Sequence, residues 1–105
     1  MPADQFDVFA NPDPESATAR PYFVVLQHSV LGAFTTRIVA PLIPATAGTA
    51  FGQLMPDVIV RGTRYVVDVT NIGVIPVGVL QERVANLEDR RYDIVRAIDL
   101  VFAGV

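Results

Sequence analysis

The sequence predicts an α+β fold, in which a mostly antiparallel β-sheet is followed by a single C-terminal helix. Short apolar segments separated by glycine, proline and polar residues are typical of β-strands. Two of these segments, residues 57–60 and 64–70, are joined by a short turn at residues 61–63, which predicts a hairpin. Only residues 87–102 have apolar side chains at the spacing of a helix.

The first two predicted strands are separated by a polar loop. Residues 5–10 form a short apolar strand with Phe6 and Val8 on one face. Residues 11–20 follow as a flexible loop with a solvated or partner-facing role, because their prolines and polar side chains sustain neither strand nor helix. Residues 22–28 have apolar side chains on both faces, so this strand is expected in the centre of the sheet.

The middle of the chain contains one more strand and an irregular segment. A third strand is predicted over residues 35–42 and is expected to end near Pro41, because proline cannot donate a hydrogen bond to a central ladder. Residues 43–56 are interrupted by several prolines and glycines, so a loop or a short turn of helix is expected there.

The predicted hairpin directs alternate side chains to opposite faces of the sheet. The side chains expected to face the core are Tyr65, Val67 and Val69. Those expected to face outward are Arg64, Asp68 and Thr70, with Val66 among them. A turn at residues 71–73 then leads to the last predicted strand, residues 75–80, and a polar link follows it.

The C-terminal helix is predicted over residues 87–102. Asn86 is a suitable N-cap, because its side-chain oxygen can accept a hydrogen bond from an unpaired backbone N–H. Asp89 stands three residues later, where it can complete a capping box. One side of the helix is apolar and carries Leu87, Ile94, Ala97, Ile98, Val101 and Phe102. The opposite side carries Tyr92, Arg96, Asp99 and Ala103.

The composition limits the possible functions of the chain. Its 105 residues are enough for one domain, expected to span residues 1–105. The absence of cysteine excludes disulfides and thiolate catalysis. The formal net charge is −3, and all eight basic residues are arginine, which argues against direct nucleic-acid binding. No segment has the ~20 apolar residues of a membrane span and no signal peptide begins the chain, so a cytoplasmic protein is expected.

The apolar content and the chain end predict a homodimer. Hydrophobic residues make up 51% of the chain, more than a small domain is expected to bury alone. Leu100 lies on the otherwise polar side of the helix, and the last residues are apolar although chain ends usually face water. A symmetric dimer is the simplest way to cover this surface. The predicted dimer interface consists of Leu100, Val101 and Val105.

Catalytic and metal-binding residues are not predicted. His28 is the only histidine, and a general base needs an orienting carboxylate and a substrate pocket. A partly buried histidine bonded to the backbone is the commoner role for such a residue. One histidine and scattered carboxylates match no metal-ligand spacing, and the glycines form no phosphate-binding motif. No catalytic residue, metal or cofactor is therefore expected.

A recurring pattern of residues connects the chain to a known family. In the last thirty residues the pattern comprises Pro76-Val77, Val79, Glu82, Val84-Ala85, Leu87, Arg90, Asp93-Ile94, Ala97-Ile98, Leu100, Phe102 and Gly104. Upstream it continues with Phe6-x-Val8, Arg37-x-Val39-x-Pro41-Leu42 and Pro56-x-Val58-x-Val60. This pattern resembles the CcdB family of toxins from bacterial toxin–antitoxin pairs.

The resemblance implies a fold, a target and a contact site. It implies a barrel-like, curled antiparallel sheet with one C-terminal helix, as in CcdB and Kid, and a homodimer. It implies binding to the A subunit of DNA gyrase, without cofactor or catalysis, and neutralisation by a cognate antitoxin. The family's terminal Phe-Trp-Gly-Ile contacts gyrase and corresponds here to residues 102–105. The gyrase-binding residues implied are Ala103, Gly104 and Val105, with alanine in place of tryptophan.

Two further functions stay open beside gyrase poisoning. The related fold of the MazF and Kid toxins cleaves RNA with charged residues, and Arg61, Arg64 and Asp68, together with His28, would be the candidates for an endoribonuclease here. An inactive relative that retains only dimerisation and antitoxin binding is the other possibility. A buried tryptophan hot spot typically contributes about 2–4 kcal/mol, so its absence is expected to weaken the gyrase contact.

Two adjacent arginines near the predicted helix start also have two interpretations. Arg90 and Arg91 oppose the helix dipole at this position. They are either a solvated pair or a contact for an antitoxin, because antitoxins of such pairs are commonly acidic.

Overall fold

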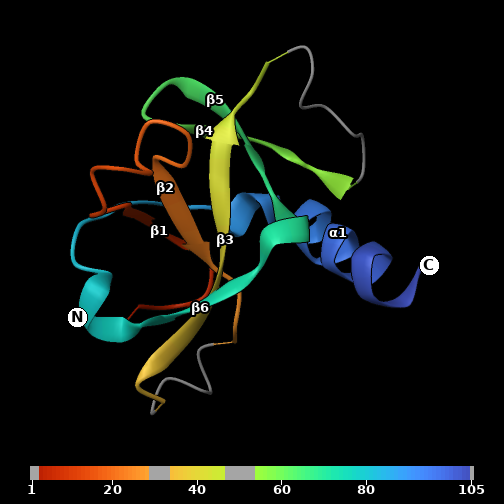
Figure 1. The fold of residues 1–105 in the computed structure, drawn as a ribbon. Coiled ribbons are helices and arrows are strands. Elements are labelled where there is room, and N and C mark those ends of the chain that lie inside the picture. Colours follow the sequence, from red (N-terminus) through yellow and green to blue (C-terminus); the bar gives the residue numbers. More distant parts are fainter. Residues whose placement is uncertain (1–2, 29–33, 47–53, 105) are drawn as a thin grey trace.

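The computed structural model describes residues 3–28, 34–46 and 54–104, which form a curled antiparallel sheet and one C-terminal helix (Figure 1). The predicted α+β fold is therefore confirmed. The strands are β1 (Asp7–Ala10), β2 (Tyr22–Val25), β3 (Thr36–Pro44), β4 (Asp57–Val60), β5 (Thr63–Val67), β6 (Gly73–Pro76) and β7 (Arg83–Asn86). The helix α1 spans Arg91–Ala103, and short 3-10 turns lie at η3 (Val69–Asn71), η4 (Val77–Val79) and η5 (Glu88–Arg90).

The long strand β3 organises the sheet. The strand order is β4-β5-β3-β2-β1-β7, and β6 pairs separately with β3. The first half of β3 pairs with β6 and its last residues pair with β5, while β2 runs along its other side. β2 thus lies between β3 and β1, as its two apolar faces predict, although it ends at Val25 rather than at His28.

β3 continues past Pro41, whereas the sequence predicts that it ends there. The strand pairs with β6 up to Val39 and with β5 from Leu42, so Pro41 lies where β3 changes its partner. The Pro41 carbonyl accepts a hydrogen bond on this side from the backbone N–H of Asp68, at 2.9 Å. In a strand, the N–H and C=O groups of one residue point to the same side. The N–H that Pro41 lacks would therefore point between β6 and β5, so its absence removes no hydrogen bond from the sheet.

The core lies on both faces of the curled sheet. One cluster packs beneath α1 and includes Phe6, Val8, Val24, Leu42, Val67, Leu87, Ile94 and Ala97. A second, smaller cluster on the other face consists of Ala3, Phe9, Val25, Val39 and Leu80. The predicted faces of the first strand are confirmed, and so are those of Tyr65, Val67 and Val69, which all contact the larger cluster.

The loop between β1 and β2 has a defined turn structure. The side-chain amide of Asn11 donates hydrogen bonds to Ser16 Oγ at 2.9 Å and to the Arg20 carbonyl at 2.8 Å. The Asp13 carboxylate accepts hydrogen bonds from the backbone N–H of Glu15 and from the Ser16 hydroxyl. The predicted loop is confirmed, and short-range polar bonds hold its exposed turn in shape.

The second hairpin strand is shorter than predicted, and two of its outward assignments are wrong. β5 ends at Val67, because the Asp68 carboxylate caps the following turn. It accepts hydrogen bonds from the Thr70 N–H and hydroxyl and from the Asn71 amide, at 2.6–3.3 Å, and these bonds allow its burial. Val66 is buried as well, with only 1% of its surface exposed.

The last strand is not the predicted one. Residues 75 and 76 end β6, residues 77–79 form the 3-10 turn η4 and Leu80 follows it, and the last strand is β7, within the segment predicted to be a polar link. β7 lies at one edge of the sheet and pairs only with β1. Its ends, Arg83 and Asn86, are exposed, and Val84 and Ala85 are half-buried, so the strand lacks a clear apolar alternation.

The α-helix begins at Arg91, four residues later than predicted, and η5 occupies the intervening turn. Asn86 is not the predicted N-cap, because Leu87 precedes η5 and Arg90 precedes α1, but its side-chain oxygen accepts a hydrogen bond from the Glu88 N–H at 2.8 Å. The Asp89 side chain is exposed and forms no hydrogen bond among the described residues, so the predicted capping box does not form.

The apolar side of α1 is buried only in its first turns. Ile94 and Ala97 are fully buried and Ile98 is half-buried. Val101 is 37% exposed and Phe102 is 72% exposed, although both were predicted on the core face. The reason is visible in Figure 1, where the last turns of α1 extend beyond the sheet.

Candidate partner-binding surface

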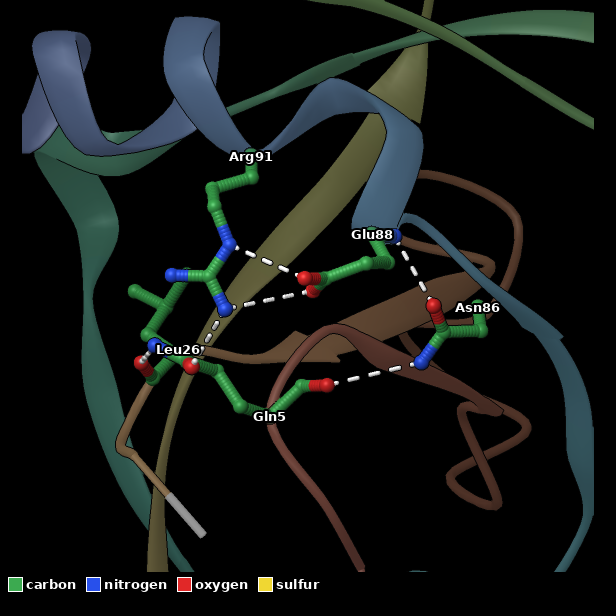
Figure 2. Close-up of polar contacts among 5 residues, drawn as sticks. All are labelled: Gln5, Leu26, Asn86, Glu88 and Arg91. Carbon is green, nitrogen blue, oxygen red and sulfur yellow. Dashed lines mark hydrogen bonds and ion pairs between the residues drawn. The ribbon is translucent and has the colours of Figure 1, made fainter.

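The start of α1 is fixed to the sheet by a polar network (Figure 2). The Gln5 amide donates to the Leu26 carbonyl at 3.0 Å and accepts from the Arg91 guanidinium at 3.4 Å. Arg91 also pairs with Glu88 at 3.0 Å, and its guanidinium carbon lies 5.0 Å from the ring centre of Phe6. This cation–π contact and the hydrogen bonds join the helix start to the segments that flank β1 and β2.

Arg90 joins the same region to the hairpin. Its guanidinium pairs with Asp93 at 2.8 Å and donates from Nε to the Asp57 carbonyl of β4 at 3.0 Å. The carboxylates of Asp93 and Glu88 offset the opposition of the two arginines to the helix dipole. Neither arginine is therefore the freely solvated side chain that one interpretation expected.

The far end of α1 has few contacts with the rest of the protein. Ala103 is exposed, and Gly104 ends the helix in the left-handed conformation, with φ 73° and ψ 14°. The Gly104 N–H donates to the Leu100 carbonyl at 3.1 Å, which is a common glycine C-cap. Leu100 itself is half-buried. Val105, assigned both to the gyrase contact and to the dimer interface, lies outside the described residues.

An apolar groove of about 390 Å³ lies beside the end of α1. Its lining includes Leu26, Ile38, Ile72, Val74, Ile98 and Phe102. Ile38 of β3 and Val74 of β6 are cross-strand partners, 41% and 65% exposed. Neither residue was predicted to belong to a partner surface. Apolar alternation alone does not show which face of a strand is left uncovered.

The candidate endoribonuclease residues are not brought together. His28 follows β2, and the Leu26 N–H bonds to the Ile38 carbonyl, so His28 lies by the first residues of β3. Arg64 lies beyond the opposite end of β3, where its backbone carbonyl accepts a hydrogen bond from the Ala45 N–H. At ~3.3 Å per residue, the length of β3 separates the two by roughly 25 Å. His28 is also exposed rather than partly buried as expected.

The charged groups of the hairpin have other partners within the fold. Arg64 pairs with Asp57 at 3.2 Å, and Arg61 lies 4.0 Å from Glu82. The carboxylate of Asp68 is occupied by the capping bonds described above. Within the described residues, no group of three or more histidine, aspartate or glutamate side chains could hold a metal ion.

The Tyr65 phenol of β5 has a raised pKa. Its ring meets that of Tyr22 edge to face, with the ring centres 5.3 Å apart. Burial, and then the neighbouring Tyr22, raise the pKa of the Tyr65 phenol. The phenol therefore stays protonated at neutral pH and is not poised to act as a base.

The comparison with known families covers almost the whole chain. The family model described as CcdB protein matches residues 5–104 of the 105. No curated protein sequence matches the chain. Among the described residues, no helix is long and apolar enough to cross a membrane. The matched region includes the anchored start of α1, its exposed end and Gly104.

Proposed function

This chain belongs to the CcdB family and is thus the toxin of a toxin–antitoxin system, and we propose that it binds and poisons the A subunit of DNA gyrase until a cognate antitoxin neutralises it. The observation that carries the proposal is the exposed end of α1. Phe102 is 72% exposed there, and Ala103 and Gly104 follow it into solvent. The proposed action is binding alone, with no cofactor and no catalytic residue.

The geometry of the helix end supports a contact of this kind. Gly104 has no Cβ, and an added one would meet no atom within 4 Å, so a partner's backbone has room to approach. The start of the same helix is held by Arg90 and Arg91. A helix that is already ordered loses little conformational freedom on binding, which favours affinity.

The proposed toxin is a homodimer whose interface includes the apolar groove. Ile38 and Val74 present an apolar surface to solvent beside Phe102, and a second copy related by a twofold axis would cover it. Val101, one of the residues predicted at this interface, is 37% exposed and directly precedes Phe102, which lines the groove. Such a dimer places two helix ends near each other for the target.

The proposal is tested by changing the helix end alone. Deleting residues 103–105 is expected to weaken binding to purified gyrase A subunit by at least ~30-fold and to abolish growth arrest, because it removes the contact. Ala103→Trp is expected to strengthen binding by about 2–4 kcal/mol, or roughly 30- to 1000-fold, because it restores a large aromatic anchor. Calorimetry gives both affinities.

The matched control is Ala19→Trp, which adds the same ring to an exposed position in the loop between β1 and β2. It should leave the affinity unchanged. Neither change at the helix end should alter the denaturation midpoint by much, since Ala103 lies outside the core. If the truncated chain binds gyrase as tightly as the full chain, the target contact lies elsewhere and the proposal is wrong.

A further inference from the structure

The outward face of α1 carries exposed side chains that the fold does not use. Tyr92 is 88% exposed, more than any other large hydrophobic residue described in the structure. Arg96, Asp99 and Ala103 follow it at intervals of four, three and four residues, and all are exposed. At this spacing the four side chains lie along one line of the helix, which ends at the proposed gyrase contact.

The charges on this face differ from those at the helix start. Arg90 with Asp93, and Arg91 with Glu88, form ion pairs at a separation of three residues. Arg96 and Asp99 have the same separation, yet within the described residues neither side chain forms an ion pair or hydrogen bond. Tyr92 likewise has no polar partner there. The helix therefore leaves one aromatic and two opposite charges available to a partner.

The size of the face fits a single interface with the helix end. Ala103 lies eleven positions after Tyr92, which is about 16 Å at 1.5 Å per residue. A typical specific interface buries about 800 Å² on each partner, a patch roughly 30 Å across. Tryptophan, tyrosine and arginine are enriched among binding hot spots, and tyrosine buries a large area with only two side-chain torsions.

We propose that Tyr92 is the aromatic anchor by which this toxin recognises its target, in a contact continuous with Ala103 and Gly104. The inference rests on the proposed function, since its partner is the gyrase A subunit. On that partner, an apolar slot receives the phenol ring of Tyr92. A carboxylate of the partner pairs with Arg96 and a basic group pairs with Asp99. The anchor then stands on the helix face rather than at position 103, which is alanine here.

The test compares variants of the full chain for binding to purified gyrase A subunit. Tyr92→Ala is expected to weaken binding by at least ~10-fold, and Tyr92→Phe, which keeps the ring, by much less. Arg96→Glu is expected to weaken binding as well, with a steeper loss at low salt. Phe34→Ala is the matched control, since Phe34 is also exposed, at 60%, but lies ahead of β3. Denaturation midpoints are measured for all variants.

The outcomes separate this inference from the proposed function. If Tyr92→Ala binds like the native chain while deletion of residues 103–105 abolishes binding, the anchor is wrong and gyrase remains the target. An equal loss in Tyr92→Ala and Phe34→Ala also overturns the anchor, because the effect is then not specific to this face. If the native chain and the Ala103→Trp variant both fail to bind gyrase, the proposed function falls and the inference with it.

Discussion

Arg61 has a backbone conformation that suits another residue better. The turn between β4 and β5 contains two residues, Arg61 with φ 51° and Gly62 with φ 80°. Hairpins with positive φ at both central positions favour asparagine or aspartate followed by glycine. A left-handed conformation costs an ordinary residue roughly 1–2 kcal/mol, and asparagine tolerates it better.

Arg61→Asn is therefore expected to stabilise the protein by about 0.5–1 kcal/mol. The substitution removes the 4.0 Å contact with Glu82, but both side chains are largely exposed, so that pair contributes little. Urea denaturation measures the change. Arg61→Ala is the control, because it removes the same contact without relieving the backbone. Equal stabilities of the two variants would show that the turn conformation carries no measurable strain.

At the scale of the elements, one side chain connects β1, β7 and the start of the helix. The Asn86 amide donates to the carboxylate of Asp7 at 3.0 Å and accepts from the Glu88 N–H at 2.8 Å. Asp7 is only 2% exposed, so its remaining partners matter to its burial; they are the Asp4 N–H and, at 3.6 Å, Arg83.

Asn86→Ala is expected to lower the free energy of unfolding by roughly 1–3 kcal/mol. It removes the hydrogen bond to the Glu88 N–H and leaves a buried carboxylate with one hydrogen bond fewer. Asp89→Ala is the control, because Asp89 is exposed and has no polar partner among the described residues; it should stay within about 0.5 kcal/mol of the native value. A loss in Asn86→Ala no larger than in this control would refute the role of Asn86 as a connector.

Local patterns predicted some elements well and others poorly. The hairpin and the helix were predicted because their turn residues and apolar spacing are local features. β7 was missed because its partner, β1, lies far away in the sequence, and pairing rather than composition makes it a strand. The periodicity of the apolar side of the helix was predicted correctly. Phe102 is nevertheless exposed, because the sheet ends before it, and a local sequence pattern does not show where the sheet ends.

The candidate partner-binding surface was also predicted only where its features depend on local sequence. Exposure of Ala103 was predicted from the opposite placement of Ile94 and Ile98 on the helix, and the structure places them so. Ile38 and Val74 were not recognised, because their exposure results from the pairing of β3 with β6 and the absence of a covering element. The burial of Asp68 depends on hydrogen bonds from Thr70 and Asn71, and strand alternation cannot predict these bonds.

At the scale of the whole molecule, the apolar groove makes the dimer testable. Val74→Asp is expected to weaken dimerisation by about 3–5 kcal/mol, or more than 100-fold, because it places an unpaired charge in the interface. Light scattering at micromolar concentration should then give the mass of a monomer, while the native chain gives a dimer.

The matched control for this substitution is Ile59→Asp. Ile59 is also 65% exposed, but it lies on the edge strand β4, away from the groove. Ile59→Asp should therefore remain a dimer. A native chain that is monomeric at the same concentration, or a dimer lost equally in both variants, would contradict the proposed interface.

The limited burial of α1 has a consequence for how the protein can change over generations. Selection for folding acts on Ile94 and Ala97, which are fully buried, and it hardly reaches the exposed side chain of Ala103. Substitutions at Ala103 therefore leave the free energy of folding nearly unchanged, so they can accumulate as the target surface changes, whereas the left-handed conformation of Gly104 favours glycine there. An alanine can replace an aromatic residue at position 103 without harm to the fold. One helix thus contains buried positions that are constrained by folding stability and an exposed position, 103, that can change as the partner changes.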